Sequence, residues 1–437
     1  MTQIYCRNAT ITGNERSACR EYLGIPYAHA DRFAYAEMID PQGEIDATQY
    51  GDACTQYRTY FPHLDVPERR FYQRELRNDQ TFTYSQDCLN LNIYTPFKEG
   101  RYPVIIFIHG GGFNSMCNCE NYLDGEGYAK RDIILVTINY RLGIFGWYTN
   151  EEIQKKYGRN GNFGLDDMVT AIRWVKKYIS CFGGDPDNIT LMGQSAGAIS
   201  IQYLCLVPEL NGLWKHAVML SGAGAFPKFA LPRKVEDTEE YWKEVMQEAG
   251  TESFAEFQKM NAEKVLAAVE TIKTRHKDNT QNTMPVIDGY FFHDSIDHLI
   301  SKPMSIDYMA DVTNNDMYTL ILYRMAQTFC KAGKGYFSFF DINAPGDHNL
   351  AFHSSDLRYV FGTLERSWRP YDDKDHQVSE TIMDYIASFA RTGNPNGNNR
   401  PHWIPGAKPL CITRKKIQMG RPSFFRLLRN TFKGDPR

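Results

Sequence analysis

The chain has 437 residues, of which 42% are hydrophobic and 23% charged, and its formal net charge is −3. Acidic and basic residues are intermixed over most of the length, so the charge pattern excludes an extended nucleic-acid-binding surface. Internal repeats and low-complexity tracts are absent, and we expect one large domain over residues 1–437.

The N-terminal third is rich in aromatic and short polar segments and is predicted to form an antiparallel edge of a sheet. Residues 1–6 contain no basic region followed by an apolar one, which a secretory leader would have. No other window is long and apolar enough for a transmembrane span. We therefore expect a soluble, cytoplasmic protein.

The continuous apolar run at residues 104–108 is typical of a strand buried on both faces of a parallel sheet. It leads directly into His109–Phe113, which contains three successive glycines. Such glycines leave backbone N–H groups free to turn toward a ligand oxygen. In hydrolases with a nucleophile elbow, these groups act together with the N–H of the residue after the nucleophile. We therefore predict an oxyanion hole made by the N–H groups of Gly111, Gly112 and Ala196.

The most informative segment is Gly193–Gly197, with the sequence Gly-Gln-Ser-Ala-Gly. It follows the apolar run 189–192 and opens a helical pattern, so it joins a buried strand to a helix through a very tight turn. Glycines on both sides let the strand and the helix approach closely. The first N–H groups of the helix would face the serine oxygen, where negative charge develops. This pattern is a nucleophile elbow, and we predict that Ser195 is the nucleophile.

Apolar strands alternate with helical patterns along the rest of the chain. A buried strand at 133–138, an amphipathic helix at 168–179 and a strand at 217–220 predict an α/β fold. Its centre would be a large, mostly parallel twisted sheet with helices on both faces. Residues 232–277 are charged and helical in pattern, and we expect a cap-side insertion near the active site. Residues 413–437 predict a basic C-terminal helix that packs on the body, with a membrane-surface helix as the alternative.

Further motifs, spread over nearly the whole chain, resemble those of the type-B carboxylesterases, which share the α/β-hydrolase fold with the cholinesterases. The segments that carry the resemblance are Leu23–Ala28, Ser85–Asn92, Asn139–Gly143, Gly161–Asp167, Phe182–Pro186 and Phe389–Asn396. The resemblance implies that the chain cleaves carboxylic esters with a Ser-His-Asp triad, without a metal or an organic cofactor. We expect a bacterial member of this family.

The resemblance also implies a position for the histidine of the triad. In the fold's chain order the acid follows the serine and the histidine comes last. Residues 351–362 resemble the family segment that carries the catalytic histidine, which assigns that role to His353. His348, in a polar turn five residues earlier, is the alternative.

The acid is assigned in the same way. Residues 313–317 resemble the segment in which the family places its glutamate or aspartate, so Asp316 is the expected acid. The strand before it lacks the family's usual glycine, which makes Asp311 the alternative if the register slips. Asp356 falls where the family often has a glutamate, and we expect it to support the site without taking part in the reaction.

These assignments predict the chemistry. His353 would take the proton of Ser195 as the serine attacks an ester carbonyl, and Asp316 would hold the imidazole in the required tautomer. The same machinery cleaves thioesters, carbamates or activated amides, which remain alternatives. The family also includes adhesion proteins without the nucleophile, so a non-catalytic binding role is a further alternative. The expected partner is a small-molecule ester, and the expected state is a monomer or homodimer.

Ten cysteines over this length do not form the framework of a disulfide-rich scaffold. Cys54 and Cys88 fall near positions that form a disulfide in secreted relatives of the family, so their pairing is left open. Cys117 and Cys119 lie one residue apart, but no second pair of ligands accompanies them, which argues against a metal site.

Overall fold

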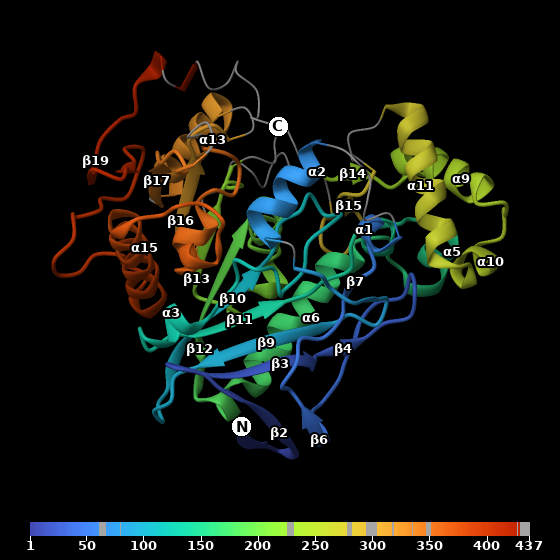
Figure 1. Cartoon of the computed structure of the whole chain (residues 1–437). Helices are drawn as coiled ribbons and strands as arrows, with labels where there is room; N and C mark the ends of the chain where they lie inside the picture. Colours follow the sequence, from blue (N-terminus) through green and yellow to red (C-terminus); the bar gives the residue numbers. More distant parts are fainter. Residues whose placement is uncertain are drawn as a thin grey trace.

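The computed structural model describes residues 1–60, 67–78, 80–224, 231–277, 282–293, 304–316, 319–333, 335–346, 351–425 and 427–428. A 13-stranded sheet forms its centre, in the order β1-β2-β3-β9-β11-β10-β12-β13-β16-β17-β18-β19, with β6 paired to β2 (Figure 1). The strands are β1 Thr2–Cys6, β2 Asn8–Glu15, β3 Arg20–Pro26, β6 Gln42–Asp46, β9 Asn90–Thr95, β10 Tyr102–Ile108, β11 Ile134–Ile138, β12 Gly184–Gln194, β13 His216–Leu220, β16 Asp307–Thr313, β17 Tyr336–Phe340, β18 Leu410–Ile412 and β19 Ile417–Met419.

The run of strands from β11 to β18 is parallel throughout, whereas β1, β2, β3 and β9 form an antiparallel edge. Side chains along β10 alternate between the two faces of the sheet: Val104 and Ile106 join one buried core, and Ile105 and Phe107 join the other. Both faces of β10 are buried, which explains why its sequence is continuously apolar. The predicted mostly parallel sheet with an antiparallel N-terminal edge is confirmed.

Helices cover both faces of this sheet. Helices α6 (Phe163–Tyr178), α7 (Ala196–Leu204) and α13 (Thr319–Gly333) contribute to the first core, and α14 (Leu357–Phe361) and α15 (Asp373–Thr392) contribute to the second. The other short elements are β4 Ala28–His29, β5 Glu37–Met38, β7 Ala53–Cys54, β8 Tyr84–Ser85, β14 Arg233–Lys234, β15 Val286–Ile287, α1 Tyr57–Tyr60, α2 Pro67–Tyr72 and α3 Glu126–Ala129.

A third apolar core lies beside the sheet. It joins α4 (Ile144–Trp147) and α5 (Glu151–Tyr157) to α9 (Glu236–Glu248), α10 (Phe254–Lys259) and α11 (Ala262–His276). Figure 1 shows α9, α10 and α11 grouped on the side of the molecule away from α15. The segment expected to be a helical insertion is therefore helical, and it has its own packed apolar interior.

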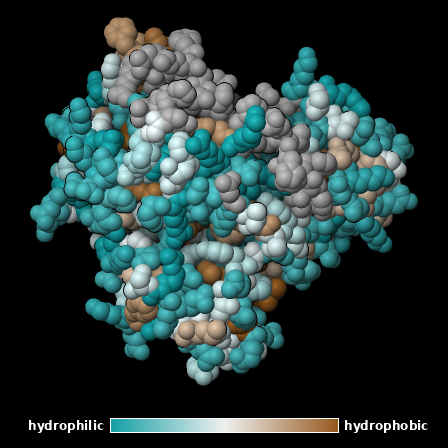
Figure 2. All heavy atoms as spheres, in the orientation of Figure 1, coloured by the Kyte–Doolittle hydropathy of each residue, from teal (hydrophilic) through white to brown (hydrophobic). Residues whose placement is uncertain are grey.

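The C-terminal segment matches the expected helix only in part. Residues 424, 425, 427 and 428 are helical, and Leu427 is buried in the first core. The residues of the segment before them are not helical. Residues 417–419 form β19, which pairs antiparallel with β18 and extends the sheet edge. Pairing satisfies the backbone groups that β18 would otherwise expose, and the basic, partly apolar sequence does not reveal this tertiary contact. Residues 429–437 lie outside the described part. On the face seen in Figure 2, apolar side chains occur in small groups within a mainly hydrophilic surface.

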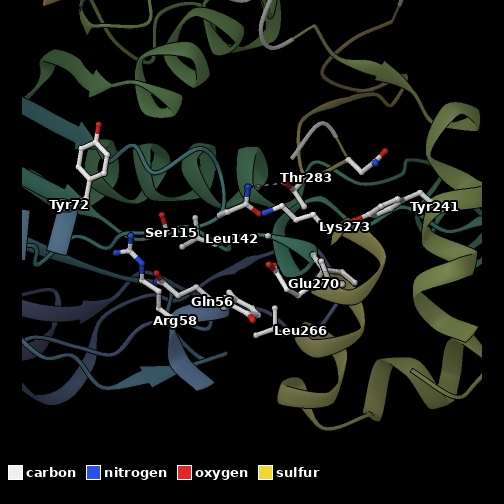
Figure 3. A pocket seen from close by; sticks show the side chains of 16 residues that line it. Gln56, Arg58, Tyr72, Ser115, Leu142, Tyr241, Leu266, Glu270, Lys273 and Thr283 are labelled. Carbon is white, nitrogen blue, oxygen red and sulfur yellow. Dashed lines mark hydrogen bonds between the residues drawn. The ribbon is translucent and has the colours of Figure 1, made fainter. Parts of the chain in front are cut away.

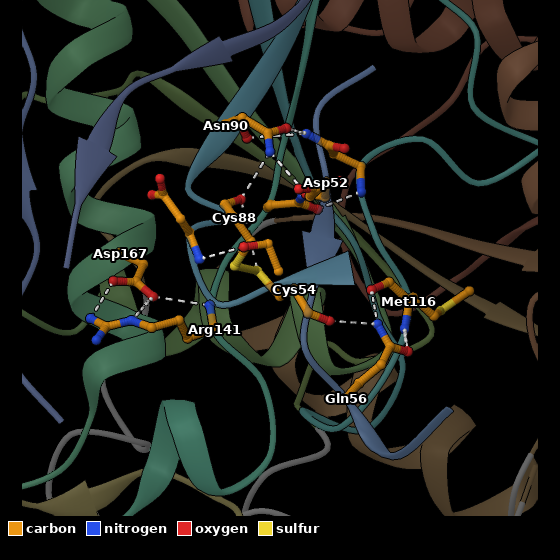
Figure 4. The surroundings of a disulfide bond; sticks show 12 residues. Asp52, Cys54, Gln56, Cys88, Asn90, Met116, Arg141 and Asp167 are labelled. Carbon is orange, nitrogen blue, oxygen red and sulfur yellow. Dashed lines mark hydrogen bonds and ion pairs between the residues drawn. A yellow bond between two sulfur atoms is a disulfide. The ribbon is translucent and has the colours of Figure 1, made fainter. Parts of the chain in front are cut away.

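Two disulfides are formed. Cys54 is bonded to Cys88, which answers the question that the sequence left open, and Cys6 is bonded to Cys181. Figure 4 shows that the Cys54–Cys88 bond lies beside the loop containing Met116, whose carbonyl accepts a hydrogen bond from Gln56 Nε2 at 3.1 Å. The bond therefore anchors the segment around β7 next to the glycine loop that follows β10.

A buried ion pair fixes the end of β11 against α6. Arg141 Nη2 lies 2.6 Å from Asp167 Oδ1, and Arg141 Nε donates to Asp167 Oδ2 at 2.8 Å. The backbone N–H of Arg141 donates to the same carboxylate, and both side chains are buried. This pair joins the Asn-Tyr-Arg-Leu-Gly motif to the helix that follows Gly161 (Figure 4). No helix within the described residues is long and apolar enough to cross a membrane.

Candidate active site

Ser195 occupies a strained turn between strand and helix. Strand β12 ends at Gln194, α7 begins at Ala196, and Ser195 between them has φ 54° and ψ −122°. A residue other than glycine adopts this backbone conformation only when its surroundings enforce it. Here the N–H of Ser195 donates to the carbonyl of Leu220, at the end of β13, with a distance of 2.9 Å. Ser195 is only half-buried, so the turn leaves it accessible.

The glycines of the elbow are required by close backbone approach. A Cβ atom on Gly193 would lie 2.7 Å from the carbonyl carbon of Gly197. A Cβ atom on Gly197 would overlap the carbonyl oxygen of Ile108 in β10. Just after the neighbouring strand β13, a Cβ atom on Gly222 would lie 2.7 Å from the carbonyl oxygen of Ser195. Each of these contacts is with rigid backbone, so none of the three positions accommodates a larger residue.

The glycine loop after β10 packs directly against the elbow. A Cβ atom on Gly110 would lie only 3.1 Å from Cβ of Ser195. Gly111 and Gly112 have φ values of +95° and +60°, which turn their N–H groups away from the strand direction. In the described ranges, no protein acceptor is bonded to the N–H groups of Gly111, Gly112 and Ala196. Unused backbone donors next to an accessible serine are what stabilisation of an oxyanion requires.

Several hydrogen bonds hold this loop in place. The N–H groups of Asn114 and Ser115 both donate to the carbonyl of Gly111 at 3.1 Å. The amide of Asn114 donates to the carbonyl of Gly112 at 2.6 Å and to Thr283 Oγ1 at 2.9 Å. The N–H of Gly143 donates to Phe113 at 2.8 Å. The loop is therefore fixed by hydrogen bonds within itself and by two other segments of the chain, at Gly143 and Thr283.

His353 and Asp316 form a buried, hydrogen-bonded pair. Nδ1 of His353 lies 2.6 Å from Oδ1 of Asp316, and the two residues are only 8% and 4% exposed. The other carboxylate oxygen of Asp316 accepts a hydrogen bond from Thr313 Oγ1 at 3.1 Å. A carboxylate that accepts from Nδ1–H keeps the proton on that nitrogen and leaves Nε2 as the basic one.

The imidazole of His353 lies next to the elbow. Its Nε2 is 3.2 Å from Nε2 of Gln194, the residue immediately before Ser195. Gln194 also donates to Ser354 Oγ at 2.8 Å, and Asn315 donates to the carbonyl of Ala351 at 3.0 Å. These bonds tie the loops of the histidine and the acid to each other and to the elbow. Gln194 was not among the predicted site residues, because its contact with His353 joins positions 159 residues apart in the chain.

The sequence left an alternative acid and an alternative histidine to compare with this pair. Asp311 accepts a hydrogen bond from Ser338 Oγ at 2.5 Å and is not bonded to His353. Asp356 is 2% exposed, and within the described ranges both its carboxylate oxygens lack a hydrogen-bond partner. His348 lies outside the described residues. The acid in contact with the imidazole is thus Asp316.

A cavity of about 350 Å³ adjoins the glycine loop. Asn114, Ser115 and Gly143 line it on the loop side, and α11 lines it with Leu266, Glu270 and Lys273 (Figure 3). Tyr241 of α9 also contributes to the wall. The helical insertion therefore forms one side of a cleft whose opposite side is continuous with the loop beside Ser195.

Other potentially reactive groups near the glycine loop are buried. Burial lowers the pKa of His109 to about 4, so this histidine is neutral at physiological pH. Sγ of Cys117 lies 3.3 Å from Sγ of Cys119, and burial raises the pKa of Cys117 well above its usual value. In the part of the chain that the structure describes, no cluster of three or more histidine, cysteine or carboxylate side chains has the arrangement of a metal site.

Taken together, the parallel sheet and the strand–turn–helix at Ser195 define an α/β hydrolase. Solved structures agree: a PNB esterase structure superposes with a TM-score of 0.83 at 25% sequence identity, covering 98% of this chain and 99% of that one. The model of the Carboxylesterase family matches residues 2–335 and 322–416, and the chain belongs to this family. It is therefore a carboxylic ester hydrolase.

Individual relatives agree with this assignment. Para-nitrobenzyl esterase of Bacillus subtilis (strain 168) is 27% identical, over 88% of this chain and 89% of the relative. Esterase cest-33 of Caenorhabditis elegans is 28% identical, over 92% of this chain and 89% of the relative. The similarity thus extends over nearly the full length of each protein.

Proposed function

We propose that the chain hydrolyses small-molecule carboxylic esters through an acyl-enzyme formed on Ser195. His353 acts as the general base, Asp316 orients it, and the N–H groups of Gly111, Gly112 and Ala196 bind the oxyanion. The observation that carries the proposal is the 2.6 Å hydrogen bond between Asp316 and His353, whose imidazole lies against the elbow that presents Ser195.

The reaction proceeds in two halves. Ser195 attacks the ester carbonyl while His353 Nε2 takes the hydroxyl proton, and Asp316 stabilises the resulting imidazolium without becoming protonated. The imidazolium then protonates the departing alcohol, and a water molecule repeats the sequence to release the acid. The backbone donors stabilise the oxyanion in both halves, because they are fixed before the charge develops.

The cleft beside the glycine loop supports a position for the substrate. Its volume of about 350 Å³ lies within the usual range for small-molecule sites. We infer that one end of the ester lies in this cleft, between Ser115 on the loop side and α11, while the carbonyl carbon reaches Ser195. Substitution of Leu266 by tryptophan is a direct probe, because it would fill the cleft and selectively raise KM for long esters.

The nucleophile assignment is tested with the Ser195→Ala variant. We expect hydrolysis of p-nitrophenyl acetate to fall by at least about 10⁴-fold, since the acyl-enzyme can no longer form. Covalent labelling by a fluorophosphonate probe should be lost at the same time. Circular dichroism and the melting temperature should stay close to those of the parent.

Ser180→Ala is the matched control, because Ser180 is an exposed serine in the turn that follows α6. This variant should keep both labelling and turnover. Undiminished turnover in Ser195→Ala would refute the nucleophile assignment. A parent protein that neither reacts with the probe nor cleaves any ester of a graded panel would instead favour a binding role.

The cellular location and the oligomeric state stay predictions. The sequence favours the cytoplasm, whereas the Cys54–Cys88 and Cys6–Cys181 disulfides favour an oxidising compartment. Alkylating free thiols in the cells that produce the protein, followed by mass spectrometry, distinguishes the two. Four protected cysteines would argue against the cytoplasm. Light scattering of the purified chain tests whether it is a monomer or homodimer.

A further inference from the structure

Behind the His353–Asp316 pair lies a second group of carboxyl side chains that the proposed reaction does not use. Asp311 is in β16 and Asp356 precedes α14, and they are only 6% and 2% exposed. Among the described residues, neither oxygen of Asp356 has a hydrogen-bond partner, and Oδ2 of Asp311 has none. Buried carboxyl oxygens are rarely left without partners, so their surroundings call for an explanation.

Both side chains line one small cavity. Its volume is about 30 Å³, and its remaining walls come mainly from apolar residues of the sheet and of α15, together with Ser338. A cavity of this size holds one water molecule, and the two carboxyl groups with Ser338 Oγ supply the polar partners that such a water requires. The cavity thus has both the volume and the polar groups for a water that bridges Asp311 and Asp356.

The ionisable groups around the cavity include carboxyl groups, which become negative, and the imidazole of His353, which becomes positive. Asp356 is influenced by the charges of Asp311, Asp316 and His353. Tyr385 of α15 lines the same cavity, and burial raises its pKa to about 12, so it is neutral. Three ionised carboxylates in one buried space would repel one another strongly. At least one of them therefore keeps its proton near neutral pH.

We propose that Asp311 and Asp356 share a proton through a water in this cavity, and that the pair is a positioning element for the Asp316–His353 hydrogen bond. When the pair carries a negative charge, it stabilises the imidazolium that His353 becomes during acyl transfer. When it is fully protonated, that stabilisation is absent. Burial raises the pKa of Asp311 to about 7, and burial also raises that of Asp356, which brings the change of charge into the working pH range.

The expected effect on catalysis rests on the proposed function. The variants Asp311→Asn and Asp356→Asn test whether the pair influences His353. Removing either partner leaves a lone buried carboxyl, which favours its uncharged form. Loss of the nearby negative charge lowers the pKa of the imidazolium. The acid limb of the kcat/KM profile should therefore shift to lower pH by about half to one unit. Asp307→Asn is the control, since Asp307 is an exposed aspartate in the same strand, and its profile should match the parent.

A second measurement is independent of turnover. Infrared difference spectra between pH 5 and pH 8, taken on the Ser195→Ala background, should show a protonated carboxyl band in the parent pair. This band should be lost or displaced in Asp311→Asn and in Asp356→Asn. An unchanged band in both variants, or profiles that superimpose on the parent despite changed melting temperatures, would overturn the proposal and leave the pair with a structural role only. Failure of the proposed nucleophile would not affect this spectrum.

Discussion

Ser195 and Gly111 show how single backbone conformations shape the site. Ser195 is held at a positive φ by its hydrogen bond to Leu220, and Gly111 has φ +95° with its carbonyl accepting from two later N–H groups. The conformation of Ser195 is unfavourable in isolation and persists because the adjoining strands enforce it. Gly111 adopts its positive φ without strain because it has no Cβ atom. The strained serine is thus associated with the presentation of its oxygen atom, and the glycine with the presentation of backbone donors.

Gly111→Ala tests the loop at this scale. The added Cβ atom would overlap the carbonyl oxygen of Ser115, so the loop must move and its N–H groups lose their alignment. We expect kcat to fall by about 10²–10³-fold with a smaller effect on KM. Gly43→Ala is the control, because Gly43 also has a positive φ but has no atoms in the way and lies in β6. Equal kcat in both variants would argue against the oxyanion assignment.

The backbone geometry at Ser195 and Gly111 could be predicted from the sequence better than the contacts made by the residues around them. The elbow and the triple glycine depend on short-range backbone sterics, so Ser195 and Gly111 are readable from a few residues. The choice between Asp316 and Asp311 is different, because both lie at the end of one apolar strand and only the fold brings one of them to His353. The contact of Gln194 with His353 likewise spans 159 positions and leaves no local pattern.

At the scale of elements, the Cys54–Cys88 disulfide fixes the segment around β7 beside the sheet. We expect the Cys54→Ser/Cys88→Ser double variant to lose about 3–4 kcal/mol of unfolding free energy, since the bond closes a loop of 34 residues. Urea denaturation measures the loss. The control is Cys411→Ser, which removes a half-buried free thiol in β18. A double variant as stable as the control would show that the bond does not constrain the chain.

The strands predicted from continuous apolar runs are present in the structure. Features that depend on tertiary contacts could not be predicted from the sequence. Strand β10 is buried on both faces, as its continuous apolar sequence predicts, whereas its pairing with β11 and β12 is seen only in the structure. Strand β19 lies within residues 413–437, which were predicted as a basic helix, and the helix is found only near residues 424–428. The pairing of β19 with β18 is a tertiary contact that no local pattern specifies. The charged segment 232–277 was predicted as helical, but its packing against Phe33 and against helices α4 and α5 depends on contacts that no local pattern specifies.

For the whole molecule, the buried carboxyl groups predict that stability depends on pH. Burial raises the pKa of Asp311 to about 7, so the folded state binds this proton more tightly than the unfolded chain, whose aspartates titrate near about 4. The stability that this bound proton contributes is therefore complete at pH values below the pKa of Asp311 in the unfolded chain. It is lost as the pH rises through the pKa of Asp311 in the folded state. We expect Asp311→Asn to raise the melting temperature, relative to the parent, more at pH 8 than at pH 5.

Calorimetry at the two pH values checks this difference, with Asp307→Asn as the exposed control. A constant offset in melting temperature between the parent and Asp311→Asn across pH 5 to pH 8 would contradict the prediction.

At the scale of the whole molecule, the sequence predicted the α/β-hydrolase architecture and the family, which its motifs specify along the whole length. A single domain and a bacterial source stay predictions, since neither follows from the packing.

The wide spacing of Ser195, Asp316 and His353 along the chain also bears on how the protein is made. In the proposed mechanism, Ser195 leaves the ribosome long before His353, its general base, has been synthesised. The growing chain therefore passes through this part of translation without the pair that would activate the serine. A fragment that ends before His353 would lack the general base that acyl transfer requires.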